Sequence, residues 1–126
     1  MREIEFRAWD QCRNTMFTNS RNVEFKIVNG VVSAVNYDWS GKEQALRVMQ
    51  YTGLKDANSV KIFEGDIIRH REGYVWTVIY ESAESRFALV CKPPLIRPLS
   101  STRSRNVKVI GNIYENPELL ATEGSL

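Results

Sequence analysis

The sequence predicts a mainly β protein, built as a small antiparallel β-barrel or sandwich with little helix. Short runs of β-branched and aromatic residues alternate with Gly, Asn, Asp and Pro turn signals at intervals of about ten residues. The 126 residues suffice for one domain with a hydrophobic core, and 43% hydrophobic and 25% charged residues are typical of globular proteins. We therefore expect a single domain over residues 1–126, with room for two lobes at about 1–50 and 51–126.

The first half of the chain contains the clearest local signal. From residue 3 apolar side chains alternate with charged ones, which indicates a half-buried strand. Further on, an Asn-Gly pair separates residues 22–28 from residues 31–37, and this pattern predicts a hairpin with a type I′ turn. In the first strand of that hairpin, Val23, Phe25 and Ile27 are expected to face inward.

Further runs of sheet-forming residues follow, at residues 60–63, 67–70, 74–80, 86–91 and 107–114. Residues 48–52 are also predicted as a strand, although the five residues before them are helix formers. Residues 64–66 make a tight turn, in which the Asp66 carboxylate is expected to accept hydrogen bonds from nearby backbone N–H groups. A short helix is expected near the end, with Asn116 as its N-cap and Pro117 in its first turn.

Residues 92–104 carry three prolines and predict a rigid, extended connector. Leu95, Ile96 and Leu99 are apolar, and on an exposed loop they would form a surface suited to self-association. The free edges of a small β protein also need cover, which the pairing of subunits provides. We therefore expect a homo-oligomer.

Charge is distributed unevenly along the chain. The 17 basic and 15 acidic residues give a net charge of +2. Between Glu84 and Glu115 there are six basic residues and no acidic one, so the rest of the chain carries 11 basic against 15 acidic residues, a net −4. The candidate phosphate-binding residues of the basic segment 92–108 are Arg97, Arg103, Arg105 and Lys108.

Two interpretations of this basic segment stay open. It contacts nucleic acid, with Tyr74, Trp76 and Tyr80 as stacking surfaces if they face it. Alternatively it is a solvated loop, balanced by the acidic part of a neighbouring lobe or subunit.

The residues that common catalytic sites need are sparse. His70, beside Arg69 and Arg71, is the only histidine, so a site with two histidine ligands is impossible, and we expect a surface or loop residue. The glycines form neither a GxGxxG nor a Walker A pattern. We therefore expect no enzymatic activity, no cofactor and no metal.

One pattern has a catalytic interpretation. Asp10, Glu24 and Lys26 have the residue types of metal-dependent nucleases, in which an acidic residue and a Glu-x-Lys strand hold Mg²⁺ and position water. Glu24 and Lys26 more simply form the solvated face of the hairpin strand. The nuclease is therefore the weaker alternative.

The two cysteines, Cys12 and Cys91, lie far apart without metal-like spacing, which is typical of reduced thiols in an intracellular protein. No apolar run resembles a signal peptide or a membrane span. We therefore expect a cytoplasmic protein without membrane contact.

Four collinear segments carry a family resemblance. They are EIEFRAWD at residues 3–10, MQYTGLKD at 49–56, FEGDII at 63–68 and VIGNIYENPELL at 109–120. In this order they resemble the YopX family of small proteins, which bacterial phages and prophages encode. The chain departs from the family at residues 57–61, where a short Asn-Gly-Lys type of turn is frequent.

The resemblance implies a mainly β fold, a phage or prophage origin and self-association, and it supplies no catalytic residue. The Glu-Gly-Asp-Ile-Ile motif is also found where SH3-like barrels begin, so we expect such an element in the C-terminal half. The sequence therefore predicts a non-enzymatic accessory protein that self-assembles or binds a macromolecule, either nucleic acid or a host or phage protein. Residues expected to determine the fold are Trp9, Asp10, Tyr51, Gly53 and Asp56.

Overall fold

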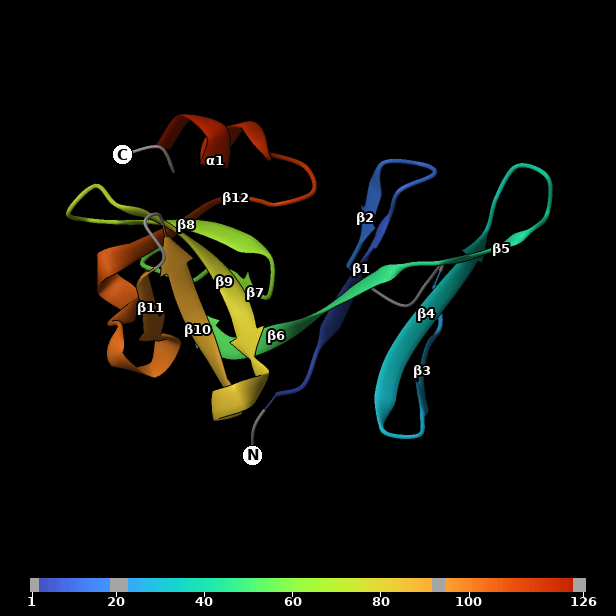
Figure 1. Cartoon of the computed structure of the whole chain (residues 1–126), viewed down its shortest axis with the longest axis horizontal. Coiled ribbons are helices and arrows are strands. Elements are labelled where there is room, and N and C mark those ends of the chain that lie inside the picture. Colours follow the sequence, from blue (N-terminus) through green and yellow to red (C-terminus); the bar gives the residue numbers. More distant parts are fainter. Residues whose placement is uncertain (1–2, 19–22, 92–94, 124–126) are drawn as a thin grey trace. The chain divides into compact units, whose positions relative to one another are not determined.

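The computed structural model describes residues 3–18, 23–91 and 95–123 (Figure 1). It confirms a mainly β fold of antiparallel sheets, in which α1 (Glu118–Glu123) is the only α-helix of the described residues. The chain divides into two compact units, Glu3–Gln50 and Tyr51–Leu126.

The N-terminal unit contains β1 (Phe6–Asp10), β2 (Thr15–Phe17), β3 (Phe25–Val28), β4 (Val31–Tyr37), β5 (Glu43–Ala45) and the first residues of β6 (Arg47–Lys55). Strand β1 pairs with β2 and with β6, and β3, β4 and β5 form an antiparallel sheet in that order. The unit has a small apolar core of Ala8, Val23, Ala34 and Leu46. Of the five helix formers before residue 48, the first three form β5 and the last begins β6, because strand pairing outweighs their local preference.

The predicted hairpin is confirmed in β3 and β4. Asn29 and Gly30 both have positive φ, +51° and +78°, as a type I′ turn requires. Val23 is buried and Phe25 packs against the core, but Ile27 is 73% exposed, so its predicted inward orientation is wrong. The strand ends near this turn have no core beneath them in the described part of the chain, and alternation alone does not reveal where a core stops.

The C-terminal unit contains the end of β6 together with β7 (Lys61–Phe63), β8 (Asp66–His70), β9 (Val75–Glu81), β10 (Arg86–Cys91), β11 (Leu95–Pro98) and β12 (Val107–Asn112). The last five strands form an antiparallel sheet in the order β11-β10-β9-β8-β12, which curls into a half-barrel (Figure 1). Its core consists of Ile62, Ile68, Trp76, Val78, Leu89, Leu99 and Val107.

The proline-bearing segment differs from the predicted connector. Residues 95–98 form the edge strand β11, in which Pro98 pairs with Ala88 of β10. The 3₁₀ helices η2 (Leu99–Ser101) and η3 (Ser104–Asn106) follow. Leu99 is only 3% exposed, so its assignment to an exposed loop is wrong, whereas Leu95 and Ile96 are exposed as expected. Residues 92–94 and residue 22, which the predictions include, lie outside the described residues.

The C-terminal turn is held by Asn116. Its Oδ1 accepts a hydrogen bond from the backbone N–H of Asn112 at 3.1 Å, and its carbonyl oxygen accepts one from the backbone N–H of Leu119 at 3.1 Å. The helix itself begins at Glu118, directly after Pro117. Among the described residues no helix is long and apolar enough to cross a membrane.

The tight turn before β8 is built as predicted. Asp66 is buried, and its Oδ2 accepts a hydrogen bond from the backbone N–H of Phe63 at 2.7 Å. Gly65 adopts a φ of +83°, and its N–H donates to the carbonyl oxygen of Val78 at 2.8 Å. The Glu-Gly-Asp motif therefore fixes the start of the curled sheet.

Candidate phosphate-binding site

Strand pairing brings like charges together at one edge of the curled sheet. Strand β12 pairs antiparallel with β8, so that Arg69 lies directly opposite Lys108 and His70 opposite Val107. Both charged residues are exposed. The register therefore places two cationic side chains next to each other on the edge strand pair.

The β8–β9 turn adds a third cation. The His70 N–H donates to the Tyr74 carbonyl oxygen at 2.8 Å, and Gly73, at φ +102°, donates to the carbonyl oxygen of His70 at 2.7 Å. This is a three-residue hairpin loop closed by a glycine with positive φ. Arg71, at its first position, donates its N–H to the carbonyl oxygen of Asn106 at 2.8 Å and its Nη1 to Asn106 Oδ1 at 3.5 Å. The loop is thus fastened to η3, which carries Arg105.

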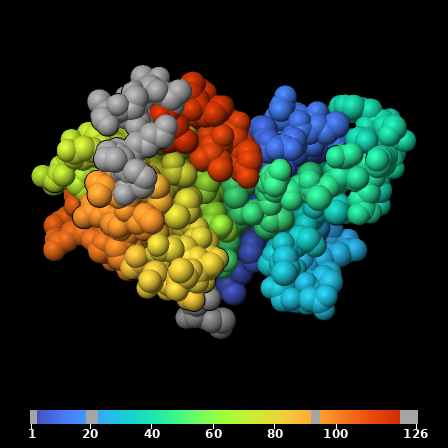
Figure 2. Space-filling model, in the orientation of Figure 1, coloured from blue at the N-terminus to red at the C-terminus, as the bar shows by residue number. Residues whose placement is uncertain are grey.

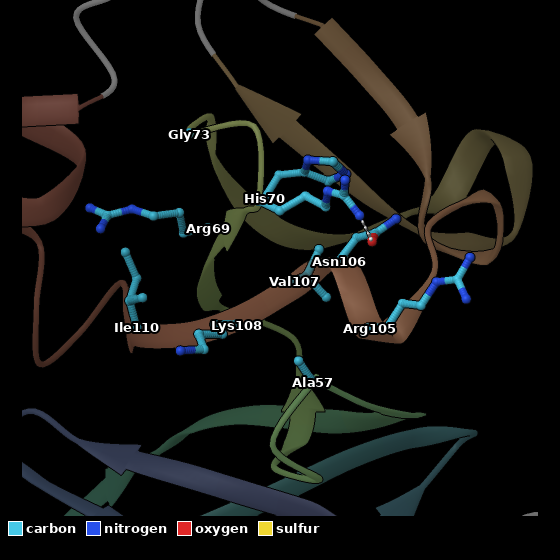
Figure 3. A pocket seen from close by; sticks show the side chains of 10 residues that line it. Ala57, Arg69, His70, Gly73, Arg105, Asn106, Val107, Lys108 and Ile110 are labelled. Atoms are coloured by element: carbon cyan, nitrogen blue, oxygen red, sulfur yellow. Dashed lines mark hydrogen bonds between the residues drawn. The ribbon is translucent and has the colours of Figure 1, made fainter.

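These elements enclose a pocket of about 390 Å³, called the basic pocket here, a size typical of ligand sites. It is lined by Ala57, Arg69, His70, Arg71, Gly73, Arg105, Asn106, Val107, Lys108 and Ile110. Four of these residues are permanent cations, and none of the ten is acidic. In Figure 3 the Arg69 and Lys108 side chains extend in the same direction, whereas Arg105 lies toward the other end of the pocket.

Asp56 holds the wall of the basic pocket at Ala57. The Ala57 N–H donates to the carbonyl oxygen of Val107 at 3.0 Å. The Asp56 carboxylate, 5% exposed, accepts the backbone N–H of Asn58 at 2.8 Å, of Val60 at 2.9 Å and of Val109 at 2.9 Å. Asp56 therefore joins its own turn to β12.

The same contacts set the ionisation of Asp56. Burial acts to raise the pKa of its carboxyl group, but the three backbone hydrogen bonds and the charge of Lys108 outweigh burial and lower the pKa below the ordinary 3.8. Asp56 is therefore ionised at neutral pH and offsets part of the Lys108 charge.

The four predicted phosphate-binding residues do not form one patch. Arg105 and Lys108 line the basic pocket, where they meet Arg69 and Arg71, which the charge count did not single out. Arg103 is exposed and is absent from the lining of this pocket. Arg97 lies elsewhere, with its guanidinium 5.5 Å from the ring centre of Trp76.

Arg97 belongs to a second pocket of about 420 Å³, called the aromatic pocket here. It is lined by Glu72, Tyr74, Trp76, Cys91, Leu95, Ile96 and Arg97. Two of the three proposed stacking residues, Tyr74 and Trp76, are therefore beside a predicted cation. The third, Tyr80, packs edge-to-face against Phe87 at 5.3 Å between ring centres.

Two of the three residues of the nuclease hypothesis, Glu24 and Lys26, line one pocket, and Asp10 does not. Lys26 pairs with Ser33, and the pocket, of about 360 Å³, is lined by Glu24, Lys26, Ser33, Ala34, Val35, Asn36 and Tyr37. The buried Asp10 carboxylate accepts a hydrogen bond from Asn36 Nδ2 at 3.4 Å.

Asp10 instead stabilises its own turn. Its Oδ1 accepts the backbone N–H groups of Cys12 at 2.9 Å and Arg13 at 3.2 Å, and its Oδ2 pairs with Arg13 Nη1 at 3.1 Å. Burial acts to raise the pKa of Asp10, but the bonds from Arg13 and Cys12 outweigh it, so the pKa is lowered. The residues that the structure describes contain no cluster of three or more His, Cys, Asp or Glu side chains able to hold a metal ion.

The fold and the site define a small antiparallel β protein with a cationic pocket at the edge of a curled sheet. Residues 5–121 match the family described as YopX protein, so the chain belongs to the YopX family and the resemblance is confirmed. No curated protein matches the sequence.

Two solved structures are similar. Protein EF1440 from Enterococcus faecalis is 26% identical with a TM-score of 0.61, and the similarity covers 95% of this chain and 99% of that one. Protein yopX from Bacillus subtilis is 18% identical with a TM-score of 0.59, over 92% of this chain and 97% of that one. The second likeness concerns the fold alone.

Proposed function

We propose that this YopX-family protein is a non-enzymatic accessory protein of a phage or prophage, that it acts in the cytoplasm of the bacterial host, and that it binds nucleic acid through the basic pocket. The observation that carries this proposal is the register of β8 and β12, which opposes Arg69 to Lys108 and adds Arg71 and Arg105 beside them.

A cluster of cationic side chains around one cavity is suited to a phosphate group. Lys and Arg side chains neutralise backbone phosphates and release counterions, which is the main source of sequence-independent affinity for nucleic acid. Backbone N–H and side-chain donors from different elements also fix the orientation of the bound strand. A site assembled from β8, the β8–β9 turn, η3 and β12 offers several such donors around one cavity.

The test is a fluorescence anisotropy titration with labelled single- and double-stranded DNA and RNA at several salt concentrations. We expect binding that weakens as salt increases. Arg105→Gln should weaken it at least about threefold, because one phosphate contact is lost. The matched control is Arg103→Gln, an identical change in the same segment outside the basic pocket, and it should have a smaller effect. Binding that is absent, insensitive to salt, or equally affected by both variants contradicts the proposal.

We also propose that the protein forms a homo-oligomer. Ile27, Val28 and Val31 are exposed at the end of the β3–β4 hairpin, and β3 is an edge of its sheet among the described strands. Antiparallel pairing of two β3 strands about Phe25 would oppose Glu24 to Lys26 of a second copy. Light scattering should show more than one subunit for the native chain and a smaller mass for Ile27→Lys. A monomeric native mass contradicts this assembly.

A further inference from the structure

The aromatic pocket has features that a phosphate site does not need. Trp76 is part of the hydrophobic core, yet its ring also lines this pocket and lies beneath the Arg97 guanidinium. Tyr74 is 55% exposed, and the apolar side chains of Leu95 and Ile96 complete the walls. Strands β9, β10 and β11, yellow to orange in Figure 2, reach the surface of the C-terminal unit.

The two pockets differ in formal charge. One acidic and one basic side chain, Glu72 and Arg97, line the aromatic pocket, so their charges cancel, whereas four cations and no acidic residue line the basic pocket. A flat, uncharged group fits between an aromatic ring, a guanidinium plane and aliphatic side chains, because all of these stack on a π-face. A nucleobase is such a group, whereas the sugar-phosphate backbone is not.

The two pockets share one turn. Arg71 and Gly73 line the basic pocket, whereas Glu72 and Tyr74 line the aromatic pocket. Successive Cα atoms are about 3.8 Å apart, so a strand with its phosphates in the basic pocket crosses little more than this turn to reach the aromatic pocket. The hydrogen bonds between His70 and Tyr74 and between Arg71 and Asn106 hold the turn in place.

We propose that the nucleic acid bound by this protein is single-stranded, with backbone phosphates in the basic pocket and one base stacked on the exposed ring of Tyr74 in the aromatic pocket. This inference rests on the proposed function. A duplex keeps its base faces covered by neighbouring pairs, so only an unpaired strand presents a base to an aromatic side chain. Arg97, whose guanidinium lies 5.5 Å from the ring centre of Trp76, forms the wall of the same pocket on the side of β11.

The experiment compares a labelled 15-nucleotide single strand, as DNA and as RNA, with a 15-base-pair duplex. Stacking on an aromatic side chain contributes enough that Tyr74→Ala should weaken single-strand binding about tenfold. Tyr74→Phe keeps the ring and should bind within about twofold of the native chain. Tyr37→Ala is the matched control, since Tyr37 is also 55% exposed but lies in the N-terminal unit.

The outcomes separate the two proposals. Weaker single-strand binding by Tyr74→Ala, with Tyr74→Phe and Tyr37→Ala close to native, supports the stacked base. If the duplex binds as tightly as the single strand and Tyr74→Ala changes neither, while Arg105→Gln weakens both, the stacking inference is overturned and phosphate binding stands. If no oligonucleotide binds in a salt-dependent way, both proposals are overturned. Circular dichroism of each variant verifies that the fold is retained.

Discussion

Replacing Asp56 tests how the C-terminal unit is held together. Its carboxylate accepts three backbone hydrogen bonds, two within its own turn and one from Val109 of β12. Hydrogen bonds to a charged group contribute about 1.5–3 kcal/mol each, but they are not additive, and water reaches the exposed Asn58 and Val60. We therefore expect Asp56→Ala to lower the free energy of unfolding by about 3–5 kcal/mol and Asp56→Asn by about 1–3 kcal/mol.

The pH dependence gives the sharper readout. The folded pKa of Asp56 lies below its ordinary 3.8, so its ionic contribution is complete above that value and is lost as pH falls through the folded pKa. The stability gap between the native chain and Asp56→Asn should therefore be full at neutral pH and shrink on acidification below about pH 4.

Urea denaturation at neutral pH and at a pH below about 4, together with hydrogen exchange of the Val109 amide, measures these effects. Asp38→Asn is the control, because the carboxylate of Asp38 accepts hydrogen bonds only from nearby groups of Ser40, Lys42 and Gln44 among the contacts of the described residues. It should leave Val109 protection unchanged. An unchanged exchange rate of Val109 in Asp56→Asn, or a stability gap that is equal at both pH values, refutes the reasoning.

Three further substitutions test local geometry, each by chemical denaturation. Gly111→Ala should lower the free energy of unfolding by about 1–3 kcal/mol, because the added Cβ would lie 2.5 Å from Asn116 Oδ1 and 2.8 Å from Asn116 Cβ. A second change, Asn116→Gly, should recover part of this loss. Gly73→Ala should lower the free energy of unfolding by about 1–2 kcal/mol through its φ of +102° alone, because no atom lies near the added methyl; an unchanged stability would show that the turn adapts. A double-mutant cycle of Arg86→Gln and Glu81→Gln should give a coupling under about 1 kcal/mol despite the 2.8 Å ion pair, and a larger value would contradict its assignment as a surface pair.

Local patterns predicted the parts of the fold that depend on a few neighbouring residues. The Asn-Gly turn and the Asp66 turn require particular residue types at fixed positions, and both are built as expected. Strand β11 was missed because Pro98 is typical of a connector, although a proline is compatible with an edge strand. Ile27 was misplaced because alternation defines a face but not what packs against it.

The site depended on pairing that no local pattern contains. The acid-free stretch drew attention to Arg105 and Lys108, but their partners Arg69 and Arg71 precede that stretch. Only the antiparallel register of β8 and β12 opposes Arg69 to Lys108. The one available signal was the Arg-His-Arg sequence at residues 69–71, in which two cations flank a histidine beside a turn.

The fold also changes what the charge asymmetry means for binding. Of the basic residues in the acid-free stretch, Arg86 pairs with Glu81 and Arg97 lies on Trp76, so neither belongs to the basic pocket. The pocket instead gathers four permanent cations, two from within that stretch and two that precede it. If all four cations contact phosphates of a single strand, log K plotted against the logarithm of the salt concentration should have a slope of about −2.8. The binding constant should then fall about 50-fold between about 50 and 200 mM salt.

The slope distinguishes a compact site from a diffuse basic surface. Arg105→Gln should reduce its magnitude by about 0.7, because one phosphate contact is removed. Arg86→Gln removes the same formal charge from the acid-free stretch but should leave the slope unchanged, since the guanidinium of Arg86 already bonds to the Glu81 carboxylate at 2.8 Å. Equal reductions in both variants would mean that nucleic acid responds to the overall charge of this segment, and the basic pocket would then lose its special role.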